Sequence, residues 1–310
     1  MSFRLCALLG FVAAVLTDCG SSQAGAPAGA AARVGRSRTS APQSLLYITD
    51  LGTNDVYVYS YPDGTPIDTL TGFNSPVRDC SDASGDVYIT NTESEEILEY
   101  AHGGEEPIAT FKDPGYLPWD CSADPTTGAL AATAYGTSPS NRGSVAIFAG
   151  NSDLPKLYQA RGVQAYLFCA YDEQGNLFVD GLDGRYNFVL IELRKGAKKF
   201  DRIAIREHFA GLGGLQWDGR YLAIGDGSSA IYDFAIKRKK ARRTHVVALK
   251  GAIDVAQFWI DGATLIAPDG PNGANHDAGF WKYPKGGKPI KLIGKGVLQN
   301  PSGATVSVAQ

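Results

Sequence analysis

The chain of 310 residues is 44% hydrophobic and 20% charged, with a formal net charge of −3, which is ordinary for a globular protein. It contains 37 Gly, 15 Tyr, 13 Phe and a single Met at the start. This profile favours many short strands joined by tight turns, and it argues against a fold built from long helices.

The amino terminus predicts export. Residues 5–16, LCALLGFVAAVL, form an apolar stretch of signal-peptide length that is too short to span a membrane. The following LTDCGSS resembles the bacterial lipoprotein signal, which implies cleavage and lipid attachment at Cys19. Asp18 departs from that pattern, which has Gly, Ala or Ser there, and ordinary secretion with cleavage near residues 24–26 is the alternative. We therefore assign 1–19 to a signal peptide, 20–43 to a flexible Ala/Gly/Ser linker and 44–310 to a folded domain.

A repeat of about 43 residues begins at Leu45 and predicts a propeller or a solenoid. The VYITN of residues 87–91 echoes the LYITD of residues 46–50. Each unit has a turn glycine before a short β-prone run, then a second strand and a tight hairpin such as YPDGTPIDTL at 61–70. The turn glycines are Gly85, Gly128, Gly175, Gly219 and Gly262.

The phase of the repeat predicts how the ring closes. Five inner strands precede the turn glycines, VRDCSD, WDCSAD, LFCAYD, GLQWD and AQFWID, whereas six strands follow them. The missing inner strand is supplied by SGATVSV at 302–308, which would pair with the first blade and leave no open sheet edge. The prediction is an all-β, six-bladed β-propeller with four-stranded antiparallel blades.

The segment PVRDCSDASGDVYIT at 76–90 is similar to an NHL repeat, and residues 45–310 resemble the six-bladed propellers of the NHL-repeat and gluconolactonase-like kind. The resemblance implies a fold more than a function, because that architecture hosts lactonases, lyases, binding proteins and scaffolds. The gluconolactonase-like enzymes use a Glu, Asn, Asn, Asp metal set, and the Glu is missing from the expected inner strand. The chain also lacks a nucleophile elbow, an HExxH motif, a phosphate-binding glycine loop and a CxxC pair.

Loops that join outer to inner strands share one face of a propeller with those that join second to third strands, and we predict a ligand site at the centre of that face. Asp79, Asp120 and Asp254 could hold a divalent cation such as calcium there. Neutralisation by Arg78 and hydrogen bonding at strand ends are the alternatives. The predicted ligand-binding residues are Arg78, Asp79, Trp119, Asp120, Tyr166, His208, Asp254 and Asn300.

Two further sets of residues have predicted structural roles. Asp50, Asn91, Asp226 and Asp269 recur near the ends of second strands, where their side chains are expected to stabilise the following turns. Cys80, Cys121 and Cys169 stand at the same place in consecutive inner strands. Buried thiols are the favoured reading, and an export route also permits a Cys80–Cys121 or a Cys121–Cys169 disulfide.

Charge is unevenly distributed along the repeat. Residues 45–160 contain 4 Lys and Arg against 17 Asp and Glu, whereas residues 161–310 contain 21 against 14. Many of the cations fall in the outer hairpins of three consecutive blades, at 194–202, 237–243 and 282–291, which predicts a basic rim that docks on an anionic surface, glycan or protein. Its residues include Arg194, Lys195, Lys198, Lys199, Lys237, Arg238, Lys239, Lys240, Arg242 and Arg243.

Together these features predict an exported, membrane-anchored, non-catalytic binding or scaffold protein of the cell envelope that needs no cofactor. Export argues against nucleic acid as the partner of the basic rim. The alternative is a metal-dependent hydrolase or lactonase with a cation near the propeller axis.

Overall fold

The computed structural model describes residues 43–113, 115–136, 142–150, 154–209, 211–270 and 275–309. The predicted signal peptide, Cys19 and nearly all of the predicted linker lie outside this part of the chain. The one helix among the described residues is the short 3₁₀ turn η1, Thr92–Ser94. The described helical structure is therefore too short to cross a membrane.

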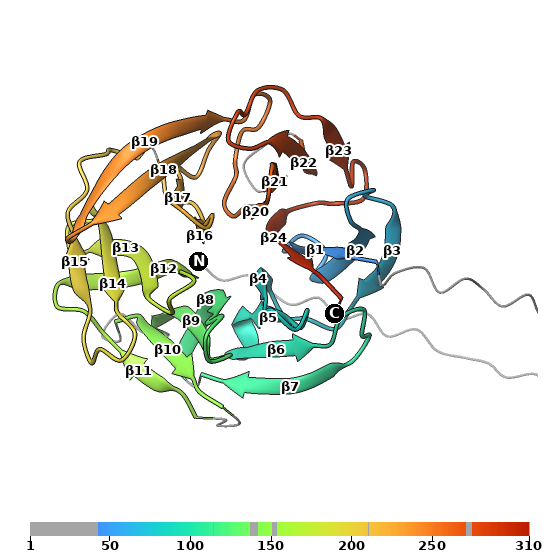
Figure 1. Cartoon of the computed structure of the whole chain (residues 1–310). Coiled ribbons are helices and arrows are strands. Elements are labelled where there is room, and N and C mark those ends of the chain that lie inside the picture. The colour runs from blue at the N-terminus through green and yellow to red at the C-terminus, as the bar shows by residue number, and fades with distance from the viewer. Residues whose placement is uncertain are drawn as a thin grey trace, which may run out of the picture. The chain divides into compact units, whose positions relative to one another are not determined.

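The described strands form six antiparallel sheets of four strands each, arranged around a ring (Figure 1). We number the sheets as blades 1 to 6. Blade 1 consists of β24 (Pro301–Ser307), β1 (Leu45–Asp50), β2 (Asp55–Ser60) and β3 (Pro66–Leu70). Blade 2 consists of β4 (Pro76–Ser81), β5 (Val87–Asn91), β6 (Glu96–Tyr100) and β7 (Pro107–Lys112). Blade 3 consists of β8 (Tyr116–Ala123), β9 (Leu130–Gly136), β10 (Ser144–Phe148) and β11 (Lys156–Tyr158).

The second half of the ring repeats this plan. Blade 4 consists of β12 (Val163–Tyr171), β13 (Leu177–Asp183), β14 (Phe188–Leu193) and β15 (Asp201–Ile203). Blade 5 consists of β16 (Leu215–Trp217), β17 (Leu222–Gly225), β18 (Ala230–Lys237) and β19 (Lys240–Ala248). Blade 6 consists of β20 (Trp259–Asp261), β21 (Thr264–Asp269), β22 (Asp277–Lys282) and β23 (Lys291–Ile293).

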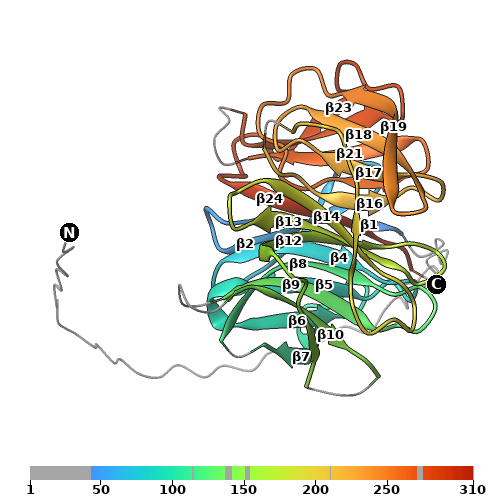
Figure 2. The same ribbon diagram turned by 90° about the vertical axis from the view of Figure 1, so that its left-hand side faces the viewer.

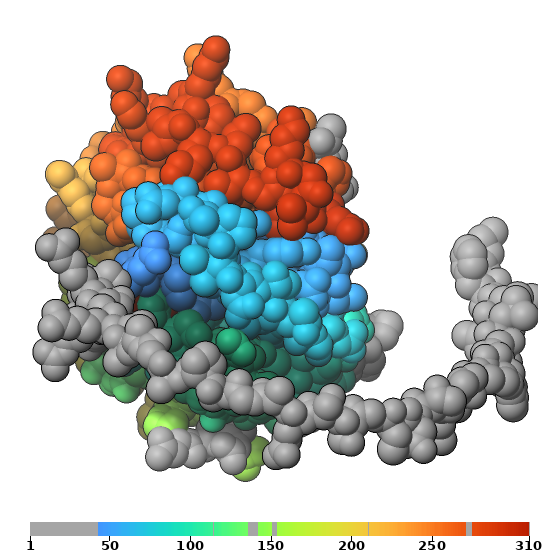
Figure 3. Space-filling view, turned by 90° about the vertical axis from the view of Figure 1, so that its right-hand side faces the viewer, coloured from blue at the N-terminus to red at the C-terminus, as the bar shows by residue number. Residues whose placement is uncertain are grey.

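The ring closes as predicted, because the last strand is the inner strand of the first blade. β24 pairs with β1 along its length, with Leu46 opposite Val306 and Ile48 opposite Ala304. Every residue of β24 is buried. In Figure 3 the first blade, in blue, lies between the last blade, in red, and the second blade, in green. The six-bladed propeller prediction is thus confirmed.

The hydrophobic core lies between blades rather than within them. Each of the six buried apolar clusters draws mainly on two neighbouring blades. For example, Ile48 and Val306 of blade 1 pack with Ile266 and Phe280 of blade 6. A single twisted sheet cannot bury both of its faces, so each blade depends on its neighbours for stability, and this accounts for the repetition in the sequence.

The turns divide the ring into two faces, which Figure 2 shows at left and right from the side of blades 4 and 5. We call hairpin face the side with the turns that join first to second and third to fourth strands. We call crossover face the opposite side, with the loops between second and third strands and between blades. The five predicted turn glycines all have a positive φ, from +54° at Gly262 to +92° at Gly219, which explains glycine at the first hairpin turns.

Candidate functional site: an axial cavity and a basic rim

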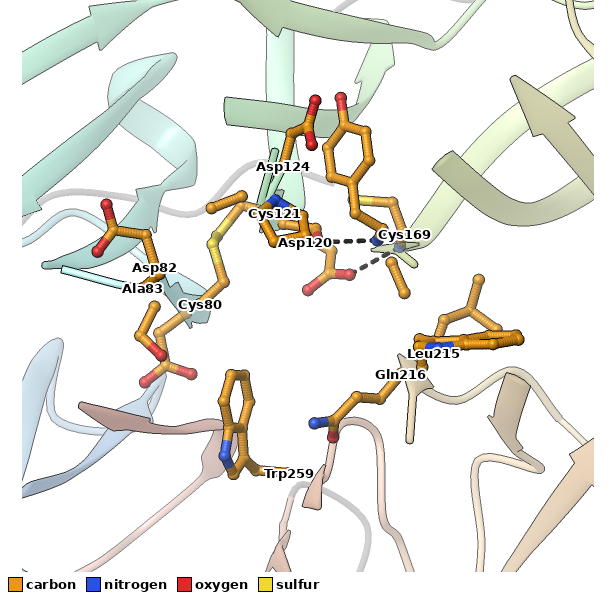
Figure 4. Close-up of a pocket in the computed structure, with 18 of the residues that line it drawn as sticks. Cys80, Asp82, Ala83, Asp120, Cys121, Asp124, Cys169, Leu215, Gln216 and Trp259 are labelled. Atoms are coloured by element: carbon orange, nitrogen blue, oxygen red, sulfur yellow. Dashed lines mark hydrogen bonds between the residues drawn. A yellow bond between two sulfur atoms is a disulfide. The ribbon is translucent and has the colours of Figure 1, made fainter. Parts of the chain in front are cut away.

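A cavity of about 470 Å³ lies near the axis of the ring, at the carboxyl ends of the inner strands (Figure 4). Its walls come from five blades and include the turns at 82–84 and 124–128, so it opens among the turns of the hairpin face. The predicted ligand site lay at the crossover face instead. The order of loops around the ring does not locate this cavity, because the inner-strand side chains decide which end of the axis is filled.

Arg78 fills the axis beneath the cavity. The side chain is only 4% exposed, and its guanidinium lies 5.3 Å from the ring centre of Trp119 and 5.5 Å from that of Phe168. Its Nη1 donates to the carbonyl of Val77 at 2.7 Å, whereas Nε has no hydrogen-bond partner in the described part of the chain. Burial lowers the pKa of Arg78 to about 10, against the opposing pull of Asp120 and Asp79.

Asp79 and Asp120 line the cavity and are almost completely shielded from water. Asp120 is well satisfied, because Oδ2 accepts the Cys169 N–H at 2.9 Å and Oδ1 accepts Gln257 Nε2 at 2.8 Å. Gln257 Nε2 also donates to the carbonyl of Asp79 at 3.1 Å. The two carboxylate oxygens of Asp79 have no hydrogen-bond partner among the described residues.

Burial dominates the electrostatics of these groups. It raises the pKa of Asp120 to about 7, although the bond from Cys169 and the charge of Arg78 oppose the shift. Burial also raises the pKa of Asp79 well above its usual range, and the neighbouring Asp120 adds to this effect. A third buried carboxyl, Asp180, has its pKa raised by burial in the same way. Arg78 is thus a single cation that faces two buried carboxyls, Asp79 and Asp120.

The predicted cation site is not assembled by these residues. No group of three or more His, Cys, Asp and Glu side chains within the described ranges is placed to hold a metal ion. Asp120 spends its two oxygens on protein donors, and Asp254 acts on Arg78 from the loop before β20. Within the described residues, Asp79, Asp120 and Asp254 do not cluster as a metal-binding group, and the metal-dependent alternative stays a prediction.

The other predicted ligand residues are dispersed. Tyr166 is fully buried in a core cluster, where its hydroxyl accepts the Ala160 N–H, so it does not project toward the axis. His208 is exposed in the loop after β15. Asn300 packs at the turn after β1, where its N–H donates to Asp50. Trp119 contacts Arg78 and stacks edge-on against Tyr135 at 5.1 Å.

The polar residues at the ends of second strands have the predicted structural role, with one variation. Asp50 and Asp226 accept backbone N–H groups of the turns that follow them, at Gly52 and Ser228. Asn91 and Asp269 instead accept N–H groups from the loops that precede the neighbouring inner strands, at Asn74 for Asn91 and at Ile253 and Asp254 for Asp269. These side chains therefore also fasten the crossover loops.

The favoured prediction of three buried thiols is wrong for two of the cysteines. Cys80 and Cys121 form a disulfide between the inner strands of blades 2 and 3, with Cα atoms 5.7 Å apart. Adjacent inner strands converge on the axis, which brings equivalent positions within reach of a disulfide. Cys169 is a buried free thiol, as predicted, and all three cysteines line the axial cavity.

The predicted basic rim is exposed and continuous. All ten of its named residues are exposed. Backbone hydrogen bonds join the end of the outer strand of one blade to the outer hairpin of the next, from Ala204 N–H to the Lys239 carbonyl and from Lys250 N–H to the Gly287 carbonyl, both at 2.8 Å. The rim also reaches the mouth of the cavity, because Lys195 Nζ donates to Thr126 Oγ1 at 2.8 Å.

Sequence reasoning missed Gln257, Trp217 and Trp259, which line the cavity. All three stand in the inner-strand segments GLQWD and AQFWID that the repeat had identified. One signal in the sequence could have identified them. These inner strands carry a Trp or a Gln where the inner strands of the earlier blades carry Asp, Cys or Ser.

Comparisons with known proteins support the fold. No protein-family model and no curated protein matches the chain. Solved structures do match it, among them a chain in the crystal structure of a nidogen–laminin complex, with a TM-score of 0.69 and 16% identity. Two others are proteins described as of unknown function from Bacteroides caccae and Desulfotomaculum acetoxidans, each 10% identical, with TM-scores of 0.62 and 0.57. Each match covers 86% of this chain and 99% of the other, and at these identities the likeness concerns the fold alone.

Proposed function

We propose that this propeller is an exported, non-catalytic binding protein that holds an extended polyanion of the acidic polysaccharide class on its basic rim. A groove of about 510 Å³ between the segment that follows β15 of blade 4 and the outer strand β19 of blade 5 carries the proposal. Its described lining contains four cations and one carboxylate over the apolar side chain of Phe234. The cations are Arg206, Lys240, Arg242 and Arg243.

Most of this positive charge is available to a partner. Arg243 pairs with Glu207 at 2.9 Å, whereas Arg206, Lys240 and Arg242 make no salt bridge within the described residues. A concave groove bordered by the long strand β19 suits a flexible chain better than it suits a flat lipid surface. Uncompensated cations at spaced positions along such a groove attract repeated anionic groups.

The charge of the other half of the ring also favours binding of a polyanion at the basic rim. Residues 45–160 carry 17 acidic against 4 basic side chains, so a polyanion is repelled from blades 1 to 3. A binding role also agrees with the solved neighbour that was crystallised as a nidogen–laminin complex.

We also propose that the chain is exported and anchored through Cys19. The apolar stretch at 5–16 and the lipoprotein-like LTDCGSS support export. The Cys80–Cys121 disulfide adds a second, independent argument, since structural disulfides persist in oxidising compartments and are rare in the cytosol. Metabolic labelling with a fatty acid, compared between the wild type and Cys19→Ala, tests the anchor.

The binding proposal is tested with fluorescein-labelled polygalacturonate and fluorescence anisotropy on the full chain. We expect binding that weakens as salt is raised. Reversing two charges in Arg206→Glu/Arg242→Glu should weaken binding about 30-fold, from about 1 kcal/mol for each cation near an anionic surface. The matched control Arg161→Glu/Arg185→Glu reverses two exposed cations on the crossover face and should change binding less than about twofold.

An equal loss of affinity in both double variants would show non-specific attraction and would overturn the proposal that the groove binds the polyanion. Phosphatidylserine vesicles provide the second arm. Binding to vesicles without binding to the polymer would make the rim a membrane surface instead, and would likewise overturn the proposal.

A further inference from the structure

The axial cavity is lined by carboxyl groups. Its described lining contains Asp79, Asp82, Asp120 and Asp124 and no Lys or Arg. Asp82 and Asp124 hold their own turns, because they accept the N–H groups of Ser84 and Thr126, but their charges still face the cavity. A site with this lining favours a cationic ligand.

Asp79 points to the kind of cation. The residue is 0% exposed, and its two carboxylate oxygens have no hydrogen-bond partner among the described residues. The nearest cation, Arg78, makes no salt bridge with it in the described part of the chain and donates to the Val77 carbonyl instead. A ligand that brings both a positive charge and N–H donors would satisfy this carboxylate, whereas one without donors would not.

The walls of the cavity suit an apolar body attached to such a group. Trp217, Trp259 and Tyr171 line it. Trp217 is held in place by stacking on Phe178, with ring centres 6.0 Å apart and planes 8° from parallel. In Figure 4 the indole of Trp259 and the carboxylate of Asp120 face the same open space from opposite sides. Aromatic faces beside carboxylates attract ammonium groups through the ring quadrupole as well as through charge.

We propose that the axial cavity binds a small primary amine, with the ammonium group at the inner end beside Asp79 and Asp120 and the apolar body against Trp259 and Trp217. The volume of about 470 Å³ fits a small molecule and is too confined for a polymer. Both carboxylates are shielded from water, so the ammonium charge would act there with little screening. This site is separate from the polyanion groove, and either can fail without the other.

Isothermal titration of the full chain at about pH 8 tests the proposal with two probes of nearly equal shape, 3-methylbutylamine and 3-methylbutan-1-ol. We expect binding of the amine and none of the alcohol. Asp79→Asn removes the charge without breaking a hydrogen bond and should weaken amine binding at least about tenfold, the effect of about 1.4 kcal/mol. Asp63→Asn, an exposed acid on a hairpin tip outside the cavity, is the matched control and should leave binding unchanged.

Trp259→Leu provides a second test of the same site. It should weaken binding of the amine and leave binding of the polyanion unchanged. The proposal is overturned if the alcohol binds as tightly as the amine, if neither probe binds, or if Asp79→Asn and Asp63→Asn behave alike. It is also overturned if calcium binds with one-to-one stoichiometry and excludes the amine, because the cavity would then be a metal site.

Discussion

Removing the Cys80–Cys121 disulfide should cost about 4 kcal/mol of unfolding free energy. The two cysteines are 41 residues apart in sequence, so the disulfide closes a loop as long as a whole blade. In the chain-entropy account, a closed loop of that length removes enough freedom from the unfolded chain to stabilise the folded state by about 4 kcal/mol. The double variant Cys80→Ala/Cys121→Ala retains small apolar side chains at both buried positions and isolates the effect of the covalent link.

Thermal unfolding followed by circular dichroism measures this loss. For a domain of this size, about 4 kcal/mol corresponds to a fall in Tm of about 7 °C. Cys169→Ala, which removes a buried thiol without breaking a link, is the control and should lower Tm much less. Thiol titration of denatured residues 43–310 should find one free thiol, that of Cys169, out of three cysteines. Three free thiols, or a loss of less than about 1 kcal/mol, would refute the reasoning.

Three other predictions concern the axis and the ring. Arg78→Met removes the cation that faces the buried carboxyls and should lower the free energy of unfolding by about 3–5 kcal/mol at neutral pH, as measured by urea denaturation. The double variant Arg78→Met/Asp79→Asn should recover part of that loss. Burial raises the pKa of Asp79, so ionisation of this carboxyl destabilises the folded wild type as the pH rises from about 4. The stability of Asp79→Asn relative to wild type should therefore grow between about pH 4 and pH 8. A constant difference in Tm across that range would contradict the buried, unpaired carboxyl. Truncation after Asn300 deletes β24 and exposes the edge of β1, so size-exclusion chromatography should show aggregation, and a monomer that still unfolds cooperatively would disprove the need for closure.

The fold could be predicted from sequence because its information is repeated. Turn glycines, β-prone runs and hairpins recur with one period, and the surplus of second strands over inner strands located the closing strand at 302–308. The structure places that strand at Pro301–Ser307, within one residue of the prediction. The exposed hairpins of the basic rim could also be predicted, because charged residues at hairpin tips lie on the surface without needing a partner.

The cavity could not be predicted, and the reason is local. The inner strands of blades 2, 3 and 4 each contain an irregularity of register, immediately before Asp79, Asp120 and Cys169. An extra residue at such a bulge changes which side chains point toward the axis and which toward the neighbouring blade. Asp79 and Asp120, two of the predicted axial residues, do line the cavity, whereas the Cys80–Cys121 disulfide was only one of several alternatives that the sequence left open.

The ring closure also determines how the domain would respond to mechanical tension. The chain enters the domain at residue 43 and passes directly into β1, which is held between β24 and β2 by ladders on both sides. A pull on residue 43 along the strand loads all the rungs of both ladders at once, because the hydrogen bonds lie across the direction of the force. All the hydrogen bonds of β1 would have to break together rather than one after another. The first blade is therefore expected to resist shear.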